Sequence, residues 1–123
     1  MKVTETAAAA AVELSNTLKK IDEAQVDVLM EAICKAKKIY VAGAGRSLLM
    51  LRCLAMRLMH LGFESYVVGD TTTPAFEKED LLIAGSGSGE TKGLVNVVEK
   101  AKKIGGTVAV MTIKKDSTLG KMS

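Results

Sequence analysis

Four short runs of apolar residues, set between helical patterns and turns, constrain the fold of this chain more than any other feature. The runs do not alternate apolar with polar residues, which is typical of strands that are buried on both faces. Such strands belong to parallel sheets with right-handed crossovers, so the sequence predicts a doubly wound α/β domain. The predicted strands cover residues 39–42, 66–68, 81–84 and 107–112.

Two helices are expected before the first strand. Apolar residues recur at helical spacing over residues 4–20, and Asp22 with Gln25 has the spacing of a capping box for a second helix. A length of 123 residues leaves room for one domain only. We therefore expect a single domain, in which residues 1–37 form N-terminal helices and residues 38–123 form an incomplete sheet-and-helix core.

Two more helical segments follow the first and third strands. Residues 47–61 are apolar on nearly all sides, so we expect protein to cover most of this helix. Asp116 or Ser117 has the character of an N-cap, for a last helix that barely begins before residue 123. The helix that follows the third predicted strand is apolar on one face, formed by Leu94, Val95, Val98 and Ala101.

Composition argues against several classes of function. Aromatic residues make up 3% and tryptophan is absent, so platforms for stacking nucleic-acid bases are not available. The net charge of +3 is mild and its lysines are spread along the chain, so we expect no nucleic-acid partner. No apolar run approaches the roughly 20 residues of a membrane span, which predicts no membrane partner and a cytoplasmic location. Cys34 and Cys53 lack the CxxC spacing of metal sites, so we expect structural thiols and no bound metal.

Two loops of similar sequence suggest the chemistry. Ala42-Gly43-Ala44-Gly45-Arg46-Ser47 and Ala84-Gly85-Ser86-Gly87-Ser88-Gly89 each follow a buried strand and open a helix. Glycines allow the backbone to approach a ligand, and the N–H groups at a helix N-terminus attract an anion. Hydroxyl groups in and beside these loops favour a phosphate ligand, although Ser88 and Thr91 could instead only cap the helix. The candidate hydroxyl donors are Ser47, Ser86, Ser88 and Thr91.

Residues that the two loops lack narrow the class of phosphorylated ligand. Neither loop has the Gly-Lys-Ser/Thr of a Walker A motif, which argues against nucleotide hydrolysis as the function. The dinucleotide pattern GxGxxG fits Gly43 and Gly45 but has Leu48 at its third glycine. Asp70 stands where a ribose-binding acid would stand, so a nicotinamide cofactor remains an alternative. A serine-rich loop is more natural for a monophosphorylated sugar.

Five segments between residues 38 and 121 occur in an order and spacing typical of a known family: VAGAGRS, AMRLMHLGF, VGDTTTP, DLLIAGSGSGET and DSTLGK. In these segments the chain resembles the 6-phospho-3-hexuloisomerase branch of the sugar isomerase (SIS) domain family. The resemblance implies a flavodoxin-like three-layer sandwich with a five-stranded parallel sheet, of which four strands are present here. It also implies a homotetramer with sites at subunit boundaries, without cofactor or metal. The implied reaction interconverts 3-hexulose 6-phosphate and fructose 6-phosphate through an enediolate, in the ribulose monophosphate pathway of formaldehyde metabolism.

The resemblance assigns roles to residues of both loops. Ser86, Ser88 and Thr91 match the family's phosphate-binding residues, and Gly45, Arg46 and Ser47 match positions that line the sugar. Glu90 lies in the same motif, as a ligand or merely as a favourable acid in the first helical turn. His60, the only histidine, is the candidate catalytic residue, with a structural role as the alternative.

Two departures from the family's pattern bear on isomerase activity. The family's carboxylate base is expected in a segment beyond residue 123, so we expect binding without isomerase activity from these residues alone. Leu48 stands where relatives have glycine, which could narrow the sugar site. A sugar-phosphate-sensing module without catalysis remains the alternative function.

Overall fold

The computed structural model describes residues 2–123 and divides the chain into two compact units, one ending at Glu31 and the other beginning at Ala32. The first unit contains α1 (Val3–Leu18) and most of α2 (Glu23–Lys35). Asp22 caps α2 as predicted, because its Oδ1 accepts a hydrogen bond from the N–H of Ala24 at 2.9 Å. No helix among the described residues is both long and apolar enough to cross a membrane.

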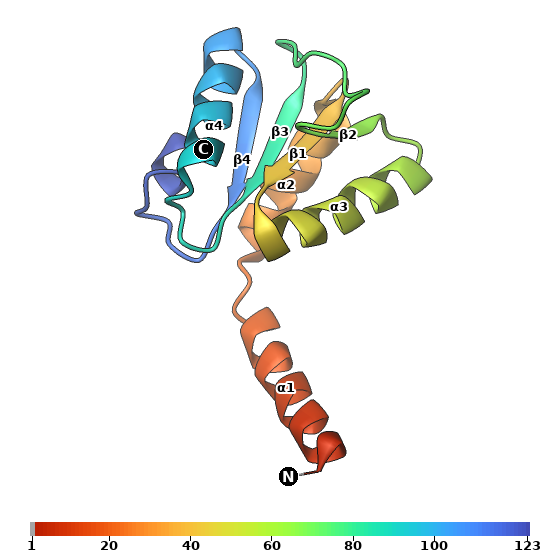
Figure 1. Ribbon diagram of the computed structural model, residues 1–123, viewed down its shortest axis with the longest axis vertical. Coiled ribbons are helices and arrows are strands. Elements are labelled where there is room, and N and C mark those ends of the chain that lie inside the picture. Colours follow the sequence, from red (N-terminus) through yellow and green to blue (C-terminus); the bar gives the residue numbers. More distant parts are fainter. Residues whose placement is uncertain (1) are drawn as a thin grey trace. The chain divides into compact units, whose positions relative to one another are not determined.

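A four-stranded parallel sheet forms the centre of the second unit (Figure 1). Its strands lie in the order β2-β1-β3-β4, so β1 and β3 are the inner pair. Each strand lies within one residue of its predicted bounds, and the predicted α/β class with two preceding helices is confirmed. The strands are β1 (Ile39–Gly43), β2 (Ser65–Val67), β3 (Leu81–Gly85) and β4 (Thr107–Met111).

Two helices cover opposite faces of this sheet and complete the three layers (Figure 1). Helix α3 (Gly45–His60) lies against β1 and β2, and α4 (Lys92–Ile104) lies against β3 and β4. Successive residues of a strand face opposite sides, so each inner strand contributes to both halves of the core. The side chains buried from the helices are Leu51, Ala55 and Leu58 of α3 and Leu94, Val98 and Ala101 of α4.

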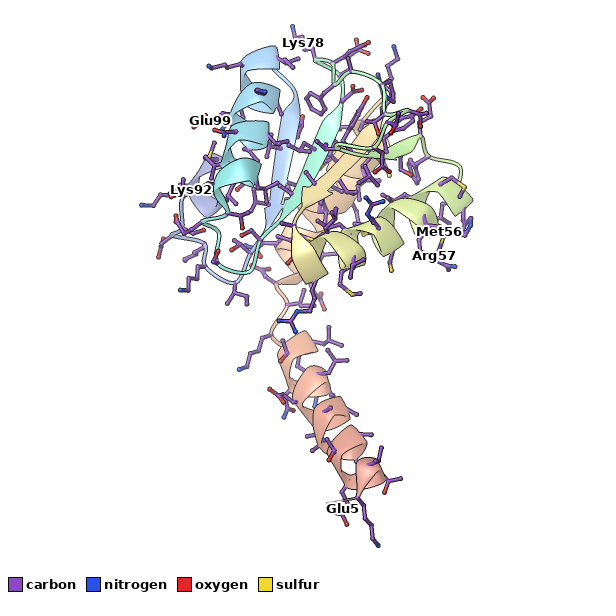
Figure 2. The ribbon with its side chains drawn as sticks, viewed as in Figure 1. Glu5, Met56, Arg57, Lys78, Lys92 and Glu99 are labelled. Atoms are coloured by element: carbon purple, nitrogen blue, oxygen red, sulfur yellow. The ribbon has the colours of Figure 1, made fainter. Side chains whose placement is uncertain are left out.

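Helix α3 is covered less completely than its composition predicts. Its inner face is buried, but Met50 is 67% exposed and Met56 is 52% exposed. Met56 and Arg57 project away from the sheet (Figure 2). Cys34 and Cys53 are also exposed, so the expectation that both are packed structural thiols is wrong for the chain as described. An apolar pattern on all sides does not say which face meets the sheet.

A polar cluster holds the connection between β2 and β3. The Tyr40 hydroxyl donates to the carbonyl of Ala75 at 3.0 Å, and burial raises the pKa of Tyr40, which keeps it a donor. Asp80 is fully buried, and its Oδ2 accepts from the N–H of Glu77 at 2.7 Å and lies 3.5 Å from Lys38 Nζ. These contacts fix the connection of residues 68–80, which has no regular secondary structure of its own.

A last short helix follows β4. It is the 3₁₀ helix η1 (Gly120–Met122), whose N-cap is Leu119 without a side-chain capping hydrogen bond, so the predicted N-cap at Asp116 or Ser117 is wrong. Ser117 Oγ still accepts a hydrogen bond from the N–H of Gly120 at 3.2 Å. Leu119, just before η1, has no exposed surface and packs in the cluster between α4 and the sheet. The segment after β4 is therefore anchored in the core.

Candidate functional site

The two glycine-serine loops begin side by side. Gly43, the last residue of β1, is the register partner of Gly85, the last residue of β3. In the order β2-β1-β3-β4, the chain leaves these two neighbouring strands toward opposite faces of the sheet. Ligands of open α/β sheets bind at such a switch point, beyond the carboxyl ends of the strands. The fold thus brings together the two loops that the sequence singled out.

Glycines at this edge let α3 approach the sheet closely. A Cβ added to Gly85 would lie 2.7 Å from Leu51 Cδ1, and one added to Gly43 would lie 3.2 Å from the same atom. Gly45 begins α3 with a φ of 55°, a conformation that favours glycine. Gly45 and Arg46 are exposed and Ser47 is half-buried, so the start of α3 is open to a ligand.

The second loop is folded around the hydroxyl of Ser86, which is 4% exposed. Ser86 Oγ accepts from the N–H of Gly89 at 3.0 Å and lies 2.9 Å from Thr91 Oγ1. Ser88 Oγ accepts from the N–H of Glu90 at 3.1 Å. Thr91 is the N-cap of α4, but its side chain makes no capping hydrogen bond. The alternative in which Ser88 and Thr91 only cap this helix is therefore not supported.

A cleft of about 320 Å³ opens between the loops. Its polar atoms come from Ser47 at the start of α3, from the turn at Ser86 and from Thr112 after β4. Its walls are otherwise apolar, so a ligand there would be oriented by a few hydroxyl and backbone groups. The apolar lining residues are Met50, Leu51, Leu54, Met111 and Ile113.

Glu90 is engaged by a residue 28 positions further along the chain. Its Oε1 accepts from the N–H of Thr118 at 3.1 Å, and its Oε2 accepts from the Thr118 hydroxyl at 3.0 Å. These hydrogen bonds hold the pKa of Glu90 below its usual range, with a smaller contribution from the charges of Lys114 and Lys121. No role for Thr118 was predicted from the sequence, although it lies within the DSTLGK segment.

His60 lies away from these loops within one chain. It is the last residue of α3 and is exposed, whereas Ser47 is in the first turn. Thirteen residues of helix separate the two, which is about 20 Å at 1.5 Å per residue. The structure therefore brings Gly45, Arg46 and Ser47 together with the loop of residues 86–91, but does not bring His60 to them.

Asp70 does not offer a free carboxylate. Its Oδ1 lies 3.1 Å from Arg52 Nη2 and its Oδ2 lies 3.5 Å from Arg52 Nη1. A ribose-binding acid must accept from sugar hydroxyls, and this carboxylate already receives two N–H groups. The pairing speaks against the nicotinamide alternative. Among the described residues, no group of three His, Cys, Asp or Glu side chains could hold a metal ion.

Comparison with known proteins agrees with this geometry. A family model described as the SIS domain matches residues 32–123. The chain belongs to the SIS domain family. The SIS match begins at the same residue as the second compact unit, so the sheet, α3, α4 and both loops all lie within it.

Curated relatives of this SIS domain are named as isomerases. The 3-hexulose-6-phosphate isomerase of Bacillus subtilis (strain 168) is 46% identical over 123 residues, which are 100% of this chain and 66% of that protein. The 3-hexulose-6-phosphate isomerase of Methanocaldococcus jannaschii is 56% identical over 84 residues, which are 68% of this chain and 47% of that protein. The chain thus spans about half to two thirds of the length of these relatives.

A solved structure matches almost the whole chain. The crystal structure of a hypothetical protein superposes with a TM-score of 0.92 and 41% sequence identity. The match covers 98% of this chain and 64% of that chain. The element order and the parallel sheet are therefore those of an experimentally observed fold.

Proposed function

We propose that this SIS domain binds a phosphorylated hexulose as part of an isomerase that interconverts 3-hexulose 6-phosphate and fructose 6-phosphate. The observation that carries the proposal is the register pair Gly43 and Gly85, which starts both hydroxyl-bearing loops at one point of the sheet edge. The names of the curated relatives support the same substrate. The ribulose monophosphate pathway, a homotetramer and a cytoplasmic location belong to this proposal as well.

The phosphate group is assigned to the loop of residues 86–91. Ser86, Ser88 and Thr91 supply hydroxyl donors, and the first turn of α4 adds N–H groups and the positive end of its dipole. The hydroxyls of Ser86 and Thr91 lie 2.9 Å apart, so both can donate to the oxygens of one phosphate group. Donors that converge on an anion at a helix N-terminus need no metal to bind it.

The sugar is assigned to the cleft beside Ser47. Gly45 and Arg46 directly precede Ser47, which lines this cleft, and both are exposed. The cleft of about 320 Å³ lies at the lower end of the range for small-molecule sites, as suits a single hexulose phosphate. The apolar side chains that line the cleft offer no polar groups of their own, so few groups compete for the hydrogen bonds that the substrate makes around its reacting carbons.

The chemistry moves a carbonyl group between two adjacent carbons. A base removes the proton from C2 of the 3-hexulose, and an enediolate forms across C2 and C3. A proton passes from O2 to O3 and another is returned to C3, which leaves the carbonyl at C2 and a hydroxyl at C3. Hydrogen-bond donors near the developing oxyanion, such as Ser47, stabilise this intermediate. His60 is proposed as an acid or base supplied by a neighbouring copy, because about 20 Å of helix separates it from Ser47 in its own chain.

Calorimetric titration tests the assignment of the phosphate. The chain is titrated with fructose 6-phosphate and with fructose, and the same titration is repeated with Ser88→Ala, with Ser86→Ala and with the control Ser15→Ala on the exposed α1. We expect binding of the phosphorylated sugar only, weakened about tenfold or more by either loop variant. Equal binding of fructose, or loop variants that bind as the control does, would contradict the proposal.

A further inference from the structure

The loop of residues 86–91 does not hold its shape alone. The segment after β4 contacts it at three successive points. The N–H of Ile113 and the hydroxyl of Thr112 both reach the carbonyl of Gly87 at 3.4 Å. The N–H of Leu119 donates to the carbonyl of Gly89 at 2.9 Å. The segment 112–119 therefore forms one side of the loop.

Among the contacts between this segment and the loop, the strongest hydrogen bonds are those that Glu90 accepts. Both of its carboxylate oxygens accept hydrogen bonds from Thr118, which contributes its backbone N–H and its hydroxyl. Hydrogen bonds to an ionised acceptor are about twice as strong as those between neutral groups. Leu119, the next residue, is fully buried in the core, so Glu90 is joined to a fixed point of the structure.

Close packing leaves little freedom beside this contact. Gly89 has a φ of 72°, and a Cβ there would lie 2.3 Å from Ser117 Cβ. The loop backbone thus passes against Ser117 with no room for a side chain. A loop held this tightly keeps its N–H groups and hydroxyls in one arrangement before a ligand arrives, which lowers the entropy cost of binding.

We infer that Glu90 is a positioning residue, which fixes the phosphate loop by binding Thr118 and does not itself touch the sugar. The inference rests on the proposed function in assigning this loop to phosphate. The carboxylate faces Thr118 with both oxygens, and a carboxylate directed at a phosphate group would oppose its binding by charge repulsion. Glu90 therefore contributes by shaping the site.

Hydrogen exchange tests the contact without any ligand. Amide exchange of Leu119 is measured by NMR in the unsubstituted chain, in Glu90→Gln, and in Glu99→Gln as a control, whose side chain projects from α4 (Figure 2). We expect roughly three- to tenfold faster exchange in Glu90→Gln only. Exchange at the same rate in all three proteins would overturn the inference.

Titration with fructose 6-phosphate and with inorganic phosphate then separates positioning from direct contact. Thr118→Val removes the hydroxyl that Glu90 accepts from, and Thr118→Ser retains it. We expect Thr118→Val and Glu90→Gln each to weaken binding by roughly three- to tenfold, the double variant to be no weaker than either, and Thr118→Ser to bind normally. Weaker binding in Glu90→Gln but not in Thr118→Val would make Glu90 a ligand residue and overturn the inference. If the unsubstituted chain binds neither probe, the proposed function fails, whereas the exchange rates still decide whether Glu90 fixes the loop.

Discussion

Gly85 ends β3 beneath the first turns of α3, and replacing it with alanine tests how closely this helix must approach the sheet. The added Cβ would lie 2.7 Å from Leu51 Cδ1 and 3.3 Å from Leu51 Cγ, well inside ordinary contact distance. Both residues are buried, but both also line the cleft, so the end of the Leu51 side chain relieves part of the overlap by turning toward it. Overpacking of a core costs about 1–3 kcal/mol. Alanine has less conformational freedom than glycine in the unfolded chain, which offsets about 0.5–1 kcal/mol of this cost. We expect Gly85→Ala to lower the free energy of unfolding by about 1–2 kcal/mol.

A double-mutant cycle with Leu51→Ala isolates the cause. Leu51→Ala alone should cost about 2–5 kcal/mol, because it leaves a cavity under α3. In the double variant the new methyl group at position 85 occupies part of that cavity, so the combined cost should fall short of the sum by about 1 kcal/mol or more. Urea unfolding followed by circular dichroism measures all four proteins. Gly93→Ala is the matched control, because a Cβ there meets nothing within 4 Å. Strictly additive costs, or a Gly85→Ala variant as stable as the control, would refute the close approach of α3.

Two further predictions concern charged groups. Asp80→Ala should lower the free energy of unfolding by about 1–3 kcal/mol, because the N–H of Glu77 loses its acceptor in a part-buried hydrogen bond and Lys38 loses its nearest carboxylate; urea unfolding measures this. The pKa of Glu90 is depressed by Thr118, so the stability that this contact contributes is present above the ordinary glutamate value of 4.5 and is lost as the pH falls through the lower folded value. Protection of the Leu119 amide should therefore persist from neutral pH to about 4.5 and decline only below it, and a decline that begins well above this value would contradict the assignment.

Local patterns predicted the elements well, for physical reasons. A buried parallel strand must be apolar throughout, so the four runs marked β1 to β4 within one residue at each end. The capping role of Asp22 could be predicted because a cap acts on the first turn of its own helix. The exposure of Met50 and Cys53 could not, since it depends on which face of α3 meets the sheet.

For the candidate site too, local features could be predicted from the sequence and contacts between distant residues could not. Ser86, Ser88 and Thr91 were identified because their spacing lies within one short loop. The contact of Glu90 with Thr118 joins residues 28 positions apart, and no periodicity of either segment encodes it. The separation of His60 from Ser47 could have been inferred from sequence, because a helix that follows a parallel strand carries the chain back to the opposite edge of the sheet.

If the two glycine-serine loops form one phosphosugar site, both must respond to the same ligand. An NMR titration of the chain with fructose 6-phosphate measures this response, with fructose as the control. We expect the largest amide shift changes in residues 45–47 and 86–93 together, and none of them with fructose. A second groove, of about 300 Å³, is lined by Arg52, Tyr66 and Asp70. Changes confined to one loop, changes centred on this second groove, or equal changes with fructose would contradict a single site formed by both loops.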